Sequence, residues 1–389
     1  MKSLFFTYNL ENLKFFVSII MVISLPLSGS LKIISLFSLL VILLIQLYKK
    51  EITLNLSAIH YGFIFLFLSA LLSSIFASDS VKSLKGARDI FYFTIPFFIA
   101  QSINHEKRIK TILWSLYIST AVAVSFGIIY SIQAQRPLEI HSLGNQNYTA
   151  MYLMTVLTAM ISTIIFSDKE TKDLKTILIM LTFLIAVGAV MTAMRTSFLA
   201  LFLFVAILFF RYKQLKSVKL ISFALLGSIV TAIFLYRPMW VKLTNTQSLI
   251  SRVSIWQHAI DIFNEHPITG IGLNHFIFKF PANHPVEPNT ILYDAHSIYF
   301  QILSQMGILG LASLFLIVIG LLNKLLKFEA ISGFEKTLKY SAMGGFLVTF
   351  VGGIFDTTLH HEHAIAFTLL TGLMVGLLPR KEKFHDNTT

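Results

Sequence analysis

Three side chains in this sequence could together move a proton and neutralise an anion. His296 stands where a long polar block gives way to an apolar run, and an imidazole that titrates near neutral pH can act as a general base. Arg195 separates two apolar runs and Arg252 lies inside the polar block, and guanidinium groups bind phosphate oxygens in a bidentate manner. The alternative is that all three residues only anchor the chain at lipid headgroups.

Other polar side chains stand at the ends of apolar runs. Trp256 follows Arg252 by one helical turn, which suits a binding-site wall or an Arg–Trp anchor at the interface. Asn145 and Asn147, in the run GNQN, could bind sugar hydroxyls, or could form a turn and a helix N-cap. Asp356 precedes a run of histidines and is a further candidate for substrate binding.

Three cations in SDSVKSLKGARDIF call for explanation, because they are expected on the side of the membrane that carries fewer positive charges. Lys82, Lys85 and Arg88 could line a phosphate site together with Arg195 and Arg252. Alternatively, they pair with the neighbouring aspartates in a solvated loop.

The run DTTLHHEHA holds His360, His361, Glu362 and His363. Histidine is a common zinc ligand, but this cluster lacks the HExxH spacing on a helix. We therefore expect no metal here, and favour headgroup-level histidines or a second acid/base site.

Composition makes this a polytopic membrane protein. The 389 residues are 55% hydrophobic and only 13% charged, with a mean hydropathy of +0.74, whereas soluble domains carry roughly 25% charged residues. Cysteine is absent, which excludes disulfides, iron–sulfur clusters and thiol catalysis. The net charge of +12 is better explained by cytoplasmic loops than by nucleic-acid binding.

An all-α architecture of about twelve membrane spans follows from the apolar runs, since a span needs roughly 20 apolar residues. The candidate spans are 13–29, 31–48, 56–77, 90–104, 111–132, 148–166, 175–193, 196–210, 218–236, 297–322, 338–356 and 363–378. With the N-terminus in the cytoplasm, the cytoplasmic segments hold 21 of the 31 Lys and Arg residues. This bias predicts that both termini are cytoplasmic and that the long loop faces outward.

Three regions result. Residues 1–236 form about nine spans, residues 237–296 form an outer loop that carries the chemistry, and residues 297–389 form the last spans and a cytoplasmic tail. Within the loop, the stretch Asn245–Asn264 is too polar for a span but has apolar residues at helical spacing. We expect an amphipathic helix there, lying at the outer interface and ended by Pro267 and Gly270.

The order of these motifs resembles the O-antigen ligase and polymerase family of bacterial envelope glycosyltransferases. The matching pieces are GNQN, MRTSF, SRVSIWQHAIDIFNEHPITGIG and HSIYFQILSQMGILG. In the last piece a histidine is followed eleven positions later by a glycine. The chain departs from the family where Ser297 follows the histidine, since Asn is common there, and the HHEH run lies outside the matched motifs.

The resemblance implies an inner-membrane enzyme that transfers undecaprenyl-diphosphate-linked polysaccharide to a sugar hydroxyl of lipid A–core at the periplasmic face. It implies an inverting reaction with no metal, nucleotide or other cofactor, and it places the essential histidine at His296. Length and layout favour a ligase. The alternatives are a polymerase of the same family, or a secondary transporter, which twelve spans would also suit. A transporter would carry its polar residues in mid-membrane and in repeated halves, and this sequence does neither.

Overall fold

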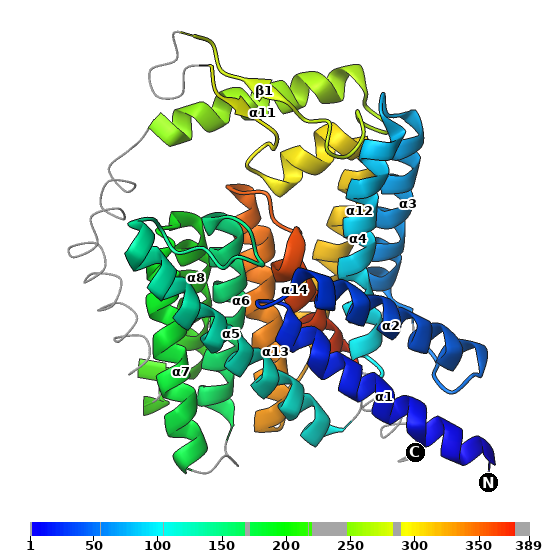
Figure 1. Cartoon of the computed structure of the whole chain (residues 1–389), viewed down its shortest axis with the longest axis vertical. Coiled ribbons are helices and arrows are strands. Elements are labelled where there is room, and N and C mark those ends of the chain that lie inside the picture. The colour runs from blue at the N-terminus through cyan, green and yellow to red at the C-terminus, as the bar shows by residue number, and fades with distance from the viewer. Residues whose placement is uncertain are drawn as a thin grey trace.

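The architecture is helical, as the apolar runs predict. A computed structural model of the chain describes residues 2–54, 56–103, 105–167, 172–216, 218–219, 247–282 and 289–377. These residues form twelve α-helices, with one π-helical and one 3-10 segment (Figure 1). A two-residue β-hairpin, β1 (Phe278–Lys279) with β2 (Ile291–Leu292), is a small addition that the sequence did not predict.

The helices follow one another in a simple order. The first eight are α1 (Lys2–Ser24), α2 (Gly29–Tyr48), α3 (Ala58–Phe76), α4 (Ser80–Ala100), α5 (Glu106–Ala134), α6 (Gln146–Phe166), α7 (Lys172–Met191) and α8 (Arg195–Tyr212). The remainder are α11 (Gln247–Glu265), α12 (Ile298–Lys327), α13 (Gly333–Phe346), the π-helix η1 (Leu347–Val351), the 3-10 helix η2 (Gly352–Ile354) and α14 (His361–Val375).

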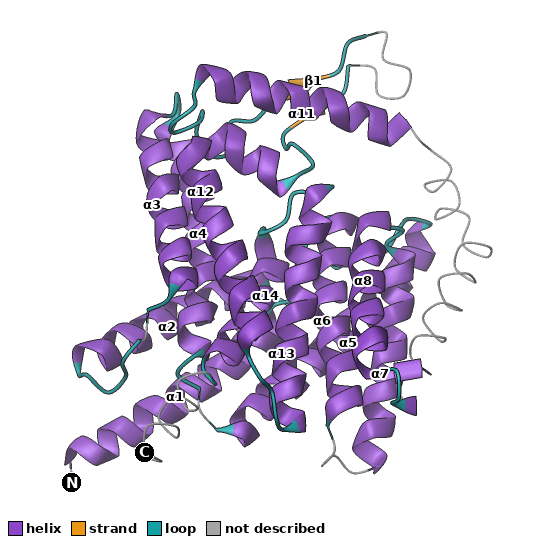
Figure 2. Ribbon diagram, turned by 180° about the vertical axis from the view of Figure 1, so that it is seen from behind, coloured by secondary structure: helices purple, strands orange, loops and turns teal. Residues whose placement is uncertain are grey.

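The bundle is arranged around α6 and α14. Helix α6 is almost wholly buried, and α14 packs between it and α4. Helices α5, α7 and α8 lie on one side of this pair, and α3, α4 and α12 lie on the other, in both ribbon views (Figures 1 and 2). Helix α11 runs across one end of the bundle and packs against α12 (Figure 1).

Membrane character is visible in helix length and in surface chemistry. Six described helices are long and apolar enough to cross a membrane, namely α2, α3, α5, α6, α7 and α12, and two shorter apolar helices are Phe198–Tyr212 and Glu362–Val375. Large apolar side chains such as Phe37, Phe126 and Phe183 are exposed on the outside of the bundle. The chain therefore fits a multi-pass membrane protein. The total of twelve spans stays a prediction, and the span expected at 218–236 lies outside the described residues apart from its first two.

The predicted loop helix is confirmed as α11, which ends at Glu265, just before Pro267. Its apolar face buries Ile255, Ala259 and Ile262 against Phe276 and Phe280 in a core separate from that of the bundle. Burial of such side chains stabilises by about 1.5–3 kcal/mol each. Helix α11 is therefore held by the loop that follows it, as well as by α12.

Helix α12 is broken at Gly307, where φ is +62° and ψ is −157°. The break frees backbone groups, and the turn that follows α11 satisfies them. The N–H groups of Ile271 and Gly272 donate to the carbonyls of Ser304 and Gln305 (3.1 and 3.0 Å), and the N–H of Ile308 donates to Pro267 (2.9 Å). Two motifs of the sequence, HPITGIG and the glycine eleven residues after His296, are thus one structural junction.

Gly307→Ala should destabilise the protein strongly. An added Cβ would overlap the carbonyl group of Ile268, and the positive φ is itself costly for alanine. We expect a loss of about 2 kcal/mol or more, seen as a lower thermal midpoint of the detergent-solubilised protein.

Gly352→Ala is the matched control, because a Cβ at this buried glycine meets nothing within 4 Å. Equal thermal midpoints for the two variants would show that the junction does not hold α12 in place.

Candidate active site

The backbone around His296 is fixed by three hydrogen bonds. The residue has φ of +47°, a left-handed conformation that histidine adopts more readily than most residues. Its N–H donates to Oδ1 of Asp294 (3.0 Å), and the Thr357 hydroxyl donates to the same oxygen (3.2 Å). The N–H of Ala295 donates to Oε1 of Gln301 on α12 (2.6 Å). The histidine is thus tied to α12 and to the loop before α14.

Two carboxylates face the imidazole. Nδ1 of His296 lies 3.3 Å from Oδ1 of Asp294 and 4.0 Å from Oδ1 of Asp356. Burial lowers the pKa of His296, but the carboxylates of Asp356 and Asp294 outweigh burial, so the pKa lies above its ordinary value of 6.5. The nearby cation Arg252 lowers this pKa, as burial does, but the carboxylates dominate.

The same geometry decides which nitrogen is available for chemistry. A carboxylate beside Nδ1 favours the tautomer in which Nδ1 carries the proton. In the neutral ring Nε2 then holds the lone pair. The side chain is partly exposed, with 27% of its surface accessible. His296 can therefore present Nε2 as a base to a molecule that enters the site.

The two arginines predicted to act together are brought together. Arg252 lies on α11, and Arg195 begins α8. Burial lowers the pKa of Arg252, Asp356 acts in the opposite direction, and Arg195 is close enough to add to the lowering. A guanidinium remains charged at neutral pH even so. Arg252 and the buried carboxylate of Asp356 therefore both affect the charge of His296, and Arg195 affects that of Arg252.

Trp256 contacts the loop that precedes α12 and carries His296, called the histidine loop below. Its indole Nε1 donates to the carbonyl of Ala295 (3.1 Å), and its ring stacks on Phe300 with centroids 5.2 Å apart. The tryptophan thus fixes α11 against the residue that precedes His296. The predicted role in substrate binding stays a prediction.

Comparison with known proteins identifies this part of the chain. Residues 180–315 match the family described as O-antigen ligase. The segment belongs to the O-antigen ligase family. No curated protein matches the chain. The resemblance inferred from the motifs is thereby confirmed.

The O-antigen ligase segment contains the central part of the site. Arg195, Arg252, Trp256 and His296 all lie within it, and so does the Gly307 junction. The other predicted site residues lie outside it, and the structure places them as follows.

Asp356 lies in the loop before α14, far from His296 in the sequence. The fold places its Oδ1 4.0 Å from Nδ1 of His296. Its Oδ1 accepts a hydrogen bond from the N–H of Thr357 (2.9 Å). Its Oδ2 is buried and has no hydrogen-bond partner within the described parts of the chain. A buried carboxylate oxygen without a donor is costly, which suggests that a substrate group completes its hydrogen bonding.

Asn145 acts as a helix cap. Its Oδ1 accepts from the N–H groups of Asn147 and Tyr148 (2.9 and 3.1 Å), so it is the N-cap of α6. This is the structural alternative considered from the sequence. The role of Asn145 and Asn147 in binding sugar hydroxyls stays a prediction.

Lys82, Lys85 and Arg88 lie on α4. Arg88 pairs with Asp89 at 3.4 Å, as the solvated alternative predicts. Helices α14 and α6 stand between α4 and α8, the helix of Arg195 (Figure 1). The three cations therefore lie on the side of the bundle opposite to Arg195. Their contact with substrate stays a prediction.

The histidine run at the start of α14 is used within the fold. Glu362 is buried and forms an ion pair with Lys32 of α2. The His363 ring contacts the carbonyl of His360 through Nδ1 (2.9 Å), and the His360 ring stacks on Tyr148. Among the described residues no group of three or more His, Asp or Glu side chains could hold a metal ion.

Sequence reasoning missed Asp294 and Thr357. Asp294 stands two residues before His296 in LYDAHS, and an aspartate commonly accepts from the backbone two residues on. That local signal could have revealed it. Thr357 had no such signal, because its contact with Asp294 spans 63 residues.

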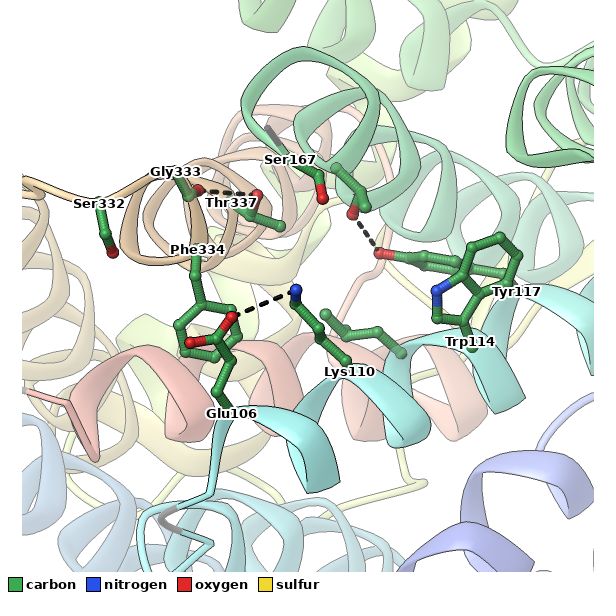
Figure 3. A pocket seen from close by; sticks show the side chains of 11 residues that line it. Glu106, Lys110, Trp114, Tyr117, Ser167, Ser332, Gly333, Phe334 and Thr337 are labelled. Atoms are coloured by element: carbon green, nitrogen blue, oxygen red, sulfur yellow. Dashed lines mark hydrogen bonds and ion pairs between the residues drawn. The ribbon is translucent and has the colours of Figure 1, made fainter. Parts of the chain in front are cut away.

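A hollow of about 620 Å³ at the opposite end of the bundle lacks these features (Figure 3). It lies between α5, α6 and α13, and several of its polar groups are paired with one another. Lys110 pairs with Glu106 at 3.2 Å, and the Tyr117 hydroxyl lies 2.9 Å from that of Thr163. The hollow therefore looks like a satisfied structural contact rather than a reactive site.

Asp294→Asn should shift the pH dependence of activity. The amide oxygen can still accept from His296 and Thr357, but the charge that raises the pKa of His296 is lost. The acid limb of the pH–activity profile should therefore move to lower pH.

Asp261→Asn is the control, since Asp261 is exposed on α11 and its carboxylate accepts a hydrogen bond from Gln257 instead of facing His296. An acid limb that does not move in Asp294→Asn would contradict the assignment of that limb to His296.

Proposed function

We propose that this chain is an O-antigen ligase of the bacterial inner membrane, with its active site facing the periplasm and both termini in the cytoplasm. The donor is undecaprenyl-diphosphate-linked polysaccharide, and the acceptor is a sugar hydroxyl of lipid A–core. The family match supports an O-antigen ligase or polymerase type of function in general. The observation that carries the specific proposal is a histidine base whose Nδ1 faces carboxylates, beside two arginines.

His296 would act as the general base. Neutral Nε2 accepts the proton of the acceptor hydroxyl as that oxygen attacks the anomeric carbon. The new glycosidic bond forms while the bond to the lipid diphosphate breaks, so the anomeric centre is inverted. Asp294 and Asp356 stabilise the imidazolium that results. No carboxylate nucleophile is needed, in contrast to retaining glycosidases.

Arg195 and Arg252 would neutralise the leaving group. The diphosphate gains negative charge as the glycosidic bond breaks, and fixed cations in a partly buried site stabilise that charge. Each guanidinium can bind two oxygens at once. The chain can thus supply from side chains the charge neutralisation that a metal ion provides in other enzymes.

Reconstitution tests the proposal. Purified protein is mixed with lipid-linked glycan and lipid A–core, without nucleotide and with a metal chelator. We expect glycan to appear on the core. Extension of one lipid-linked glycan by another, with the core left bare, would identify a polymerase instead, and failure of both transfers would overturn the proposed function.

His296→Ala should retain only trace transfer, because a general base contributes roughly 10²–10⁴-fold. Donor binding should persist, because the arginines remain. In the wild type, activity should fall with decreasing pH through a pKa above 6.5, since only neutral His296 can accept a proton.

Transfer is measured with donor binding followed separately, and His141→Ala, an exposed histidine in the loop before α6, is the control. Normal transfer by His296→Ala, together with an inactive Asp356 or His360 variant, would place the base elsewhere.

Arg252→Ala and Arg195→Ala should each lose most transfer while protein levels stay near normal. Lysine should rescue poorly, because an ammonium lacks the planar fork that binds two oxygens. Initial rates at saturating acceptor and varied donor provide the measurement. Wild-type rates in both alanine variants would rule out the arginine clamp.

A further inference from the structure

A second, partly open hollow lies next to the loop that carries His296, on its α4 side. Its wall combines residues of α3, α4 and α12 with the segment 357–360. Two wall residues hold the histidine loop: Thr357 donates to Asp294, and Gln301 accepts from Ala295. The hollow therefore opens beside the reacting centre, at the end of the bundle that α11 covers.

The chemistry of its wall is polar and mostly uncharged. Asn274, Gln301, Gln305 and Thr357 contribute amide or hydroxyl groups, and Asp89 lies in the same wall. The side-chain nitrogen of Gln305 is buried and has no hydrogen-bond partner in the part of the chain that the structure describes. A buried amide donor without a partner is unfavourable, so an acceptor atom of a bound molecule would stabilise it. Amides and hydroxyls among apolar side chains suit a sugar ring.

The position of the hollow distinguishes it from the arginine pair. Direct displacement requires the incoming hydroxyl and the leaving diphosphate to lie on opposite faces of the anomeric carbon. Arg195 stands at the α8 side of the bundle, whereas the hollow lies at the α4 and α12 side (Figures 1 and 2). If the diphosphate lies against Arg195, the attacking hydroxyl comes from the other face of the anomeric carbon, and this hollow lies on the side of the bundle away from Arg195.

A route for a lipid-anchored molecule continues outward. An adjoining hollow of about 600 Å³ shares Asp89 and Phe93 with the first. It is also lined by Lys32, Ile33, Tyr92 and Ile365, so it reaches helix α2. Ile33 and the nearby Ile34 and Phe37 of α2 are exposed apolar side chains, suited to lipid chains. A glycolipid could hold its chains against α2 and extend a sugar toward Gln305.

We propose that the hollow lined by Gln305 is the subsite for the acceptor sugar, entered from the α2 side of α4. The inference rests on the proposed transferase function and adds to it the binding site of the acceptor sugar. Gln305 would donate its amide N–H to a sugar oxygen, and Asp89 would accept from a hydroxyl at the mouth.

The test compares apparent KM values for the two substrates, with lipid A–core as acceptor and lipid-linked glycan as donor. Gln305→Leu should raise the acceptor KM about tenfold, the effect of one lost hydrogen bond, and leave the donor KM unchanged. Its thermal midpoint should not fall, because the substitution removes an unsatisfied donor. Asp89→Ala, at a partly exposed position, should raise the acceptor KM by a smaller factor. If Gln305→Leu does not fold, the acceptor KM of Asp89→Ala tests the subsite instead.

Thr371→Val is the matched control, since its hydroxyl is equally buried and unpartnered among the described residues but lies on α14, outside the hollow's wall. An unchanged acceptor KM in Gln305→Leu and Asp89→Ala, while wild-type protein transfers glycan, would overturn this inference alone. No transfer by wild-type protein would overturn the proposed function and the inference with it.

Discussion

The site depends on a backbone junction between two segments separated by about forty residues. The turn after α11 donates to and accepts from the backbone of α12 where that helix breaks at Gly307. Both sides of the contact use glycines at positive φ, Gly270 and Gly307, whose Cβ atoms would overlap the opposite backbone. Besides this contact, α11 is held by its small separate core and by the contacts of Trp256 with Ala295 and Phe300.

From this junction the electrostatics of the site follow. Helix α11 carries Arg252 close enough to Arg195 of α8 for their charges to interact, and its Trp256 donates a hydrogen bond to the carbonyl of Ala295, the residue before His296. The first turns of α12 and the loop before α14 then set Asp294 and Asp356 on the Nδ1 side of the imidazole. The carboxylates are thus held on the Nδ1 side of the histidine, which leaves Nε2 for the proton of an acceptor hydroxyl, and Arg252 lies close enough to affect the charge of the same ring.

Local patterns were sufficient to predict much of this arrangement. Helical spacing predicted α11, and residue type with position predicted His296, Arg195 and Arg252. Long-range contacts had no local signature, so Thr357, the Gly270–Gly307 junction and the Gln305 hollow could not be predicted. Asn145 illustrates the converse case, because one residue type serves equally well as a helix cap or a sugar ligand, and the structure shows the cap. The number of spans depends on segments outside the described residues as well.

The orientation of the donor is the central claim, and a structure with a bound, non-transferable lipid-diphosphate glycan tests it most directly. The account predicts diphosphate oxygens against Arg195 and Arg252, with the anomeric carbon facing Nε2 of His296 and the Gln305 hollow left open. A diphosphate bound instead to Lys82, Lys85 and Arg88 of α4, with the anomeric carbon turned away from His296, would contradict it.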